Sequence, residues 1–163
     1  MSLIDIQKEI YQNKVNKGFN ITDINKEFCL IYGEVAEAYE AWRKKLESAG
    51  EELADVAIYL LGLSEILHIN LEDNVRNISN EGFDDSSINK AFCLLYCKVC
   101  ESYEAWDRKE DISEKLASIF VHLSNMSRAL GFNLDEEIEK KVAVNRDRTY
   151  SVIDGVLKRT SDH

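Results

Sequence analysis

Four acidic residues recur at helical spacing within a short stretch of the chain. Glu34 and Glu37 lie three positions apart, and Glu52 and Asp55 repeat that spacing after a short gap. Each residue of an α-helix turns by about 100°, so residues three apart share one face. Clustered carboxylates suit Mg²⁺ or Mn²⁺, which keep bound water and also hold phosphate groups. The four side chains are therefore candidate ligands of a hard divalent cation.

Both acidic pairs lie in segments with the periodicity of amphipathic helices. The apolar positions step by four and three, which predicts helices that pack in a bundle. The acids are displaced from their apolar stripes in the same sense on both helices. Antiparallel packing would therefore bring the four carboxylates together at the rim of the core. The stripes are Ile24, Phe28, Ile31, Val35, Ala38 and Trp42, and then Leu53, Val56, Leu60, Leu63 and Leu67.

The whole sequence predicts an all-α fold. Proline is absent and glycine is sparse, so the main helix breakers are missing. A length of 163 residues fits a single domain spanning residues 1–163. We expect helices near residues 3–16, 23–45, 50–68, 71–80, 86–109, 112–130 and 134–157.

The chain also contains an internal repeat. Residues 16–45 and 80–109 are identical at 17 of 30 aligned positions, including the segments INK, FCL and YEAW. We interpret this as a tandem duplication of a helical hairpin, with repeats at about 16–79 and 80–148 and a C-terminal helix extending to about residue 158. Two such hairpins would pair into a four-helix-bundle-like core with flanking helices.

Charge and composition narrow the classes of partner. The formal net charge is −10 at pH 7, which disfavours nucleic acid and anionic membranes because both attract basic surfaces. The first ten residues lack the basic and apolar regions of a signal peptide. No apolar run approaches the ~18 residues that a membrane span needs. We therefore expect a cytoplasmic protein that binds neither nucleic acid nor membrane.

The four cysteines all fall inside predicted helices. In a cytoplasmic chain we expect Cys29, Cys93, Cys97 and Cys100 to be buried thiols. Cys97 and Cys100 form a CxxC pair. No predicted strand precedes this pair and no second ligand pair follows it, which disfavours a redox or zinc site.

Two segments resemble the MazG-like all-α nucleoside triphosphate pyrophosphohydrolases. They are GEVAE and the later EELADVAIYLLGLSEILHINLED, and the ExxE–gap–ExxD signature of that family fits Glu34, Glu37, Glu52 and Asp55. The resemblance implies that these acids bind Mg²⁺. It also implies a house-cleaning hydrolase that splits nucleoside triphosphates, deoxynucleotides above all, into monophosphate and pyrophosphate. Members of the family commonly form dimers, so the resemblance also implies a homodimer of two such chains.

A second part of the resemblance lies near the C-terminus. The segment EKKVAVNRDR resembles the trailing K…N..R pattern of the family, which falls on Lys141, Asn145 and Arg148. These residues step by four and three, so on a continuous helix they share one face. The resemblance places them near the nucleotide, and we hypothesise that they form a cationic clamp for its phosphates. A solvated, charged helix end is the alternative.

The second repeat has lost most of the acids. Lys98 stands where the first repeat has Glu34, Lys115 replaces Glu52, and Ser118 replaces Asp55. We therefore expect one competent metal site per chain. Decay of a redundant site explains the lysines, and direct contact with a phosphate is the alternative.

Two other functions fit the same fold. One is a nucleotide-binding or regulatory protein with little catalytic activity. The other is a helical interaction module whose acidic rim binds a basic partner without metal. The intact set of four acids favours the enzyme over the first alternative, and the second predicts no metal dependence.

Overall fold

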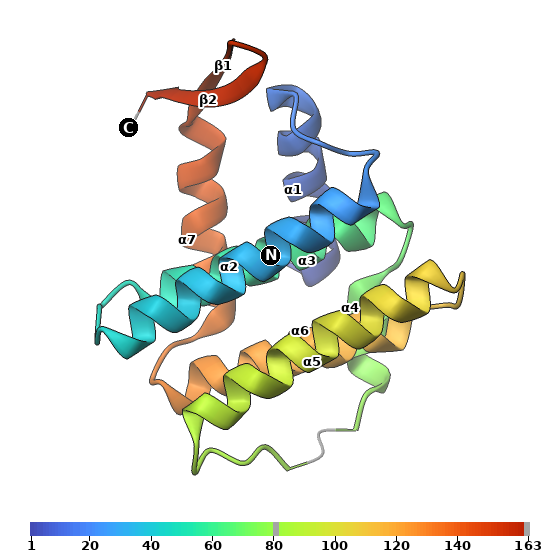
Figure 1. Cartoon of the computed structure of the whole chain (residues 1–163), viewed down its shortest axis with the longest axis vertical. Helices are drawn as coiled ribbons and strands as arrows, with labels where there is room; N and C mark the ends of the chain where they lie inside the picture. The colour runs from blue at the N-terminus through green and yellow to red at the C-terminus, as the bar shows by residue number, and fades with distance from the viewer. Residues whose placement is uncertain (80–81, 162–163) are drawn as a thin grey trace.

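The computed structural model of the protein describes residues 1–79 and 82–161, and it confirms the all-α prediction (Figure 1). Helices occupy most of the described chain, and a small two-stranded sheet follows them near the C-terminus. The helices are α1 (Leu3–Lys17), α2 (Ile24–Arg43), α3 (Ala49–Ile66), α4 (Leu71–Asn77), α5 (Ile88–Asp107), α6 (Ser113–Ala129) and α7 (Leu134–Asp147). Within the described residues, no helix is both long enough and apolar enough to cross a membrane.

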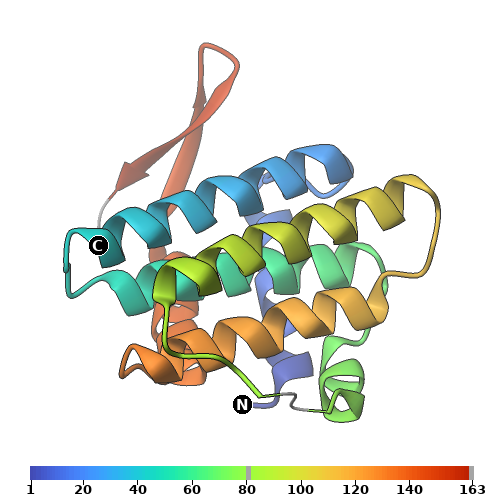
Figure 2. The same cartoon turned by 60° about the horizontal axis from the view of Figure 1, so that its bottom comes forward.

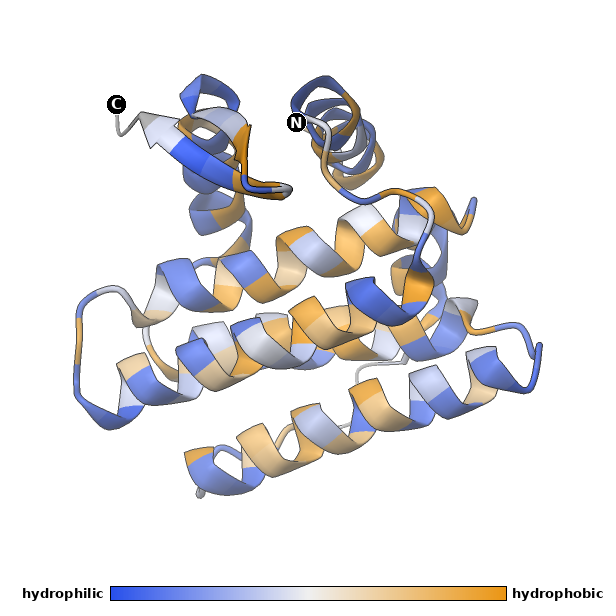
Figure 3. Cartoon of the chain, turned by 45° about the horizontal axis from the view of Figure 1, so that its top comes forward, coloured by the Kyte–Doolittle hydropathy of each residue, from blue (hydrophilic) through white to orange (hydrophobic). Residues whose placement is uncertain are grey.

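Four long helices form the centre of the molecule. Helices α2 and α3 make one hairpin and α5 and α6 make another, and the hairpins meet where α2 contacts α5 and α3 contacts α6 (Figure 2). Polar and apolar residues alternate along these helices, as expected where one face of each lies in the core (Figure 3). Val35, Leu60, Leu95 and Leu123 are completely buried between them.

Matching contacts join the two hairpins. The Tyr39 hydroxyl donates a hydrogen bond to the Asn89 side-chain oxygen at 3.0 Å, and the Tyr103 hydroxyl donates to that of Asn25 at 2.8 Å. Each pair consists of a tyrosine of one repeat and an asparagine of the other, and the two pairs exchange the roles of the repeats. The interface between the hairpins is therefore built as a pseudo-two-fold contact, like that of a symmetric dimer.

Helices α2 and α5 begin and end in the same way. The side chain of Asp23 accepts from the Lys26 amide, and the side chain of Ser87 accepts from the Lys90 amide, so each helix has a polar N-cap. Lys45 and Lys109 then take positive φ angles just after the two helices. The left-handed turns end both helices at equivalent places and start the connections to α3 and α6.

The outer helices pack on these hairpins. Helix α1 lies against α3, and α4 lies against α6 in the same way. Helix α7 also packs on α3, so α3 is covered by elements from both ends of the chain (Figure 1). Helix α4 ends at Asn77, short of the predicted residue 80, and residues 80–81 lie outside the described part.

The predicted helix 134–157 begins where expected, but its C-terminal part and the extension to about residue 158 are wrong. Helix α7 ends at Asp147 and an antiparallel hairpin follows, formed by β1 (Thr149–Ile153) and β2 (Val156–Ser161). Asp154 and Gly155 take φ values of 53° and 75°, the positive angles of a two-residue hairpin turn. The β-branched residues on either side of an Asp-Gly pair favour a hairpin over a helix.

The prediction of buried cysteines is also wrong. All four cysteines are exposed free thiols on α2 and α5. Cys29 follows the buried Phe28, and Cys93 follows the buried Phe92 at the matching position. A shift of one residue turns a side chain by about 100° around the helix, and this is enough to move the thiols from the core to the surface.

Candidate active site

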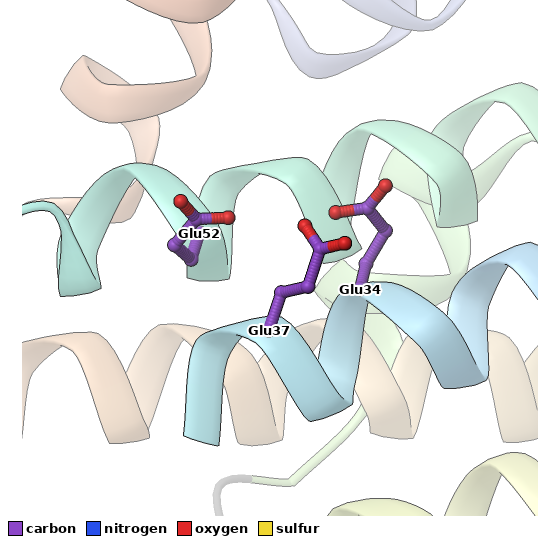
Figure 4. A group of neighbouring side chains, drawn as sticks. All are labelled: Glu34, Glu37 and Glu52. Carbon is purple, nitrogen blue, oxygen red and sulfur yellow. The ribbon is translucent and has the colours of Figure 1, made fainter. Parts of the chain in front are cut away.

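Three carboxylates converge where α2 faces α3. Glu34 and Glu37 project from α2, and Glu52 reaches toward them from α3 (Figure 4). One oxygen from each of the three lies within 4.8 Å of the others. Glu34 and Glu52 are partly buried, whereas Glu37 is exposed. Three convergent carboxylate oxygens form a donor set that fits a hard cation such as Mg²⁺ or Mn²⁺.

The negative charges of these three carboxylates repel one another. Burial raises the pKa of Glu34 to about 7, and the charges of Asp55, Glu37 and Glu52 add to the shift. The pKa of Glu52 is also raised, first by burial and then by Asp55. A bound divalent cation would offset this repulsion, so the electrostatics of the cluster favour a cation.

Asp55 has a different partner from the one expected. Its carboxylate oxygen Oδ2 lies 2.9 Å from the Lys141 ammonium of α7, and it is not one of the three converging acids. Burial raises the pKa of Asp55, and Lys141 offsets part of that rise. Burial also opposes the charge of Lys141, yet Asp55 and the surrounding carboxylates raise its pKa. Lys141 thus neutralises an acid beside the cluster and does not stand free to hold a phosphate.

A cavity opens beside the carboxylates. It has a volume of about 260 Å³, and both Glu34 and Asp55 line it. Asn145 and Arg148, from the end of α7, also line this cavity. The Arg148 guanidinium donates a 2.8 Å hydrogen bond to the Asn145 side-chain oxygen, which fixes its direction. The structure therefore brings Asn145, Arg148 and two of the four acids to one cavity, whereas Lys141 does not line it.

The end of helix α7 determines where Arg148 lies. The helix stops at Asp147, and Arg148 has an extended backbone with ψ of 140°. The Lys17 ammonium, at the end of α1, donates to the backbone carbonyls of Arg146 and Arg148. Arg148 is therefore held by a contact between the first and last helices, and not by a continuous helical face shared with Lys141.

Sequence reasoning missed the aromatic wall of the cavity. Phe19, Tyr59 and Tyr150 line it together with Asn13. The rings of Phe19 and Tyr150 meet edge to face, with centroids 4.8 Å apart. Phe19 recurs in the second repeat as Phe83, so the repeat carried a signal for this position. Tyr150 carries no comparable signal, because the sequence predicts a helix for its segment.

A buried ion pair adjoins the rings, and one of its members, Lys14, lines the cavity. Lys14 of α1 pairs with Glu27 of α2, and their side chains are 8% and 0% exposed. The Lys14 ammonium also lies 5.3 Å from the centre of the Tyr59 ring. Oxygen Oε2 of Glu27 has no hydrogen-bond partner among the described residues. Two buried charges next to the cavity were not anticipated, because they come from different helices and follow no common motif.

Comparison with protein-family models, curated proteins and solved structures gives no match to this chain. The MazG-like resemblance therefore stays a prediction from the sequence motif. Within the described residues, Glu34, Glu37 and Glu52 are the one group of three or more potential ligands placed to share a metal ion.

Proposed function

We propose that the protein is a divalent-metal-dependent hydrolase that converts nucleoside triphosphates, deoxynucleotides above all, to monophosphate and pyrophosphate. One observation carries this proposal. The carboxylates of α2 and α3 adjoin a cavity that Glu34 and Asp55 line together with the cation Arg148. A site with cation ligands and a fixed guanidinium suits a polyphosphate chain. The resemblance of the acid motif to MazG-like enzymes supplies the class of reaction.

The residues divide into three roles. Glu34, Glu37 and Glu52 would hold Mg²⁺, which when bound polarises phosphoryl oxygens and lowers the pKa of a bound water. Arg148 would offset phosphate charge as the bond to the leaving pyrophosphate breaks. Asp55 lies on the cavity wall with its charge balanced by Lys141, and it would accept the proton of the attacking water.

The remaining wall suits the nucleoside. Phe19, Tyr59 and Tyr150 provide aromatic surface, and Asn13 provides both a hydrogen-bond donor and an acceptor. Aromatic faces stack on any base, whereas an amide can select between base edges. The cavity volume of about 260 Å³ lies just below the range of about 300–1,000 Å³ usual for small-molecule sites. A nucleotide would lie with its charged end at the acids and its flat end at the rings.

A release assay tests the proposed activity. We would measure pyrophosphate released from a panel of ribo- and deoxynucleoside triphosphates with Mg²⁺, and repeat the assay with EDTA. Glu37→Gln should lower turnover by about 100-fold or more, because removal of a charged ligand disrupts the cation site. Glu101→Gln, at the matching exposed position of α5, should leave turnover unchanged.

Two outcomes would replace the proposal. Metal-dependent nucleotide binding with no pyrophosphate release would indicate a regulatory nucleotide-binding protein. No heat of Mg²⁺ or Mn²⁺ binding in calorimetry would indicate a helical interaction module with a metal-free acidic rim.

A further inference from the structure

A second cavity occupies the equivalent place in the other hairpin. It has a volume of about 660 Å³, and Lys98 and Ser118 line it where Glu34 and Asp55 line the first cavity. The neighbouring wall residues correspond as well. Val121 and His122 line the second cavity, as Ile58 and Tyr59 line the first.

Residues on the opposite wall of the two cavities also correspond between the repeats. Asn77 and Phe83 line the second cavity, and each lies 64 positions after its counterpart in the first cavity, Asn13 and Phe19. Helix α4 carries Asn77 and packs on α6, just as α1 carries Asn13 and packs on α3. The asparagine and the phenyl ring are thus kept in both cavities, while the acids are kept in one.

The replaced acids change the charge of the second cavity. The Lys98 ammonium donates a 2.8 Å hydrogen bond to the Ser118 hydroxyl, and it forms no ion pair among the described residues. Lys90 and Asp84, which also line the cavity, neutralise each other at 3.1 Å, and Glu114 is exposed at its edge. A half-buried ammonium beside a hydroxyl, without a carboxylate partner, is suited to an anion.

The rest of the wall is uncharged and includes two rings, those of His122 and Phe83. Nitrogen Nε2 of His122 lies 2.8 Å from the backbone oxygen of Ala91, so this nitrogen is the donor and the imidazole direction is fixed. Burial lowers the pKa of His122, which keeps the ring neutral. The ring meets Phe83 edge to face, with centroids 5.4 Å apart. A ligand here meets the ammonium of Lys98, the paired ammonium of Lys90, and the rings of His122 and Phe83.

We propose that this second cavity binds a phosphate-bearing organic anion of nucleotide size without a divalent cation, with the phosphate at Lys98 and Ser118. The two cavities, which correspond to each other in the two repeats, would then each bind a phosphate-bearing ligand in a different way. The first holds its ligand through carboxylates that need a metal ion, and the second holds its ligand through a lysine that does not. Binding at the second cavity does not depend on hydrolysis at the first, so the proposal stands even if the proposed function fails.

The test is calorimetric titration of the full chain in EDTA, with inorganic phosphate and with a panel of nucleoside monophosphates as separate probes. We expect a monophosphate to bind and to bind more tightly than inorganic phosphate. Lys98→Glu should weaken that binding at least tenfold. Lys44→Ala, which breaks a surface ion pair with Glu40, should not change it. Absence of binding at millimolar probe, or binding that Lys98→Glu leaves unchanged, would overturn the proposal.

A gain-of-function variant provides an independent readout. The triple substitution Lys98→Glu, Lys115→Glu and Ser118→Asp gives the second cavity the acids of the first. It should abolish monophosphate binding in EDTA and raise the number of Mn²⁺ ions bound per chain by one. Lys98→Met, which keeps the length and most of the volume of the side chain, serves if the triple variant does not fold. Equal affinity for inorganic phosphate and the monophosphates would overturn the organic part of the proposal.

Discussion

The Lys141 ammonium and the Asp55 carboxylate lie 2.9 Å apart, although 86 positions separate them in the chain. This ion pair ties α7 to α3 beside the three converging acids. It removes one acid from the cluster and places one positive charge next to it. The charge state of the candidate metal site is therefore determined by a residue outside the repeat hairpin that carries the acids.

Replacing Lys141 with Met should strengthen cation binding. Loss of the ammonium leaves Asp55 free and removes a repelling charge near the cluster, so Mn²⁺ affinity should rise on the order of tenfold. The metal-free protein should become less stable at pH 8, because the carboxylates lose their compensating charge. Calorimetry and thermal unfolding measure both effects. Lys140→Met, which breaks an exposed pair with Glu137, is the matched control, and equal effects of the two variants would contradict the prediction.

The raised pKa of Glu34 predicts a pH-dependent stability. Its folded-state pKa is about 7, against a usual value of 4.5, so the folded protein binds the proton more tightly than the unfolded chain. Stability is therefore highest below about pH 4.5 with respect to this group and falls as pH rises toward 7. Denaturant unfolding in EDTA at pH 5, 6, 7 and 8 should show this fall. Glu34→Gln should reduce the slope, and an unchanged slope would argue against the assignment.

The same group links pH to metal binding. A cation binds the ionised form of Glu34, so binding should release protons and strengthen as pH rises through about 7. Calorimetry in buffers of different ionisation enthalpy counts the released protons. Identical apparent enthalpies in all buffers at pH 6.5 would show that no proton is released.

Breaking the buried pair of Lys14 and Glu27 should destabilise the fold. Lys14→Ile leaves Glu27 buried and unpaired, which should cost about 3–5 kcal/mol of unfolding free energy. The second repeat has Ile78 and Ala91 at the matching positions, 64 residues later. The double variant Lys14→Ile, Glu27→Ala should therefore regain most of the loss in denaturant unfolding. A double variant as unstable as the single one would show that the charges themselves are needed.

Arg148 should contribute to nucleotide affinity. Arg148→Glu reverses the cation that lines the first cavity, so binding of a triphosphate with Mg²⁺ should weaken by roughly 10-fold to 100-fold. Arg146→Glu changes a nearby exposed residue that pairs with Glu9 instead. Titration of both variants separates a site effect from a change in net charge. Unchanged affinity in Arg148→Glu would exclude it from the phosphate site.

Adding a single methyl group at Gly50 should destabilise the folded protein. A Cβ atom at Gly50 would lie 2.6 Å from the Phe132 ring, so Gly50→Ala should cost about 1–3 kcal/mol of unfolding free energy through overpacking. Gly33→Ala is the matched control, because a Cβ there meets nothing within 4 Å. At that exposed helical position alanine should stabilise the protein by about 0.5–1 kcal/mol. Destabilisation of equal size in both variants would contradict the packing explanation.

The acidic cluster was accessible from the sequence because its geometry is mostly local. The spacing of Glu34 and Glu37 places both on one face of α2, and the hairpin turn brings Glu52 opposite them. Asp55 shows the limit of this reasoning. Its spacing from Glu52 is the same, yet its partner comes from a helix far along the chain.

The C-terminal hairpin was not predicted from the sequence, for a different reason. The Asp154–Gly155 turn and its β-branched neighbours are a local signal, and the helical continuation of α7 overrode it in the prediction. As a result, Tyr150 and its contact with Phe19 were not anticipated. The exposed cysteines were misplaced because the periodic pattern marks a stripe, and a residue one position away leaves that stripe.

The sequence by itself determined the helical class, the repeat and the identity of the acids, because each depends on residue type and on spacing along one helix. Only the tertiary structure decided that Lys141 neutralises Asp55, that the ends of α1 and α7 hold Arg148 at the cavity, and that Lys98 lines a second cavity. These relationships depend on how separate helices pack against each other. Packing direction and depth follow from the whole set of side chains in the core, so no single stretch of sequence encodes them.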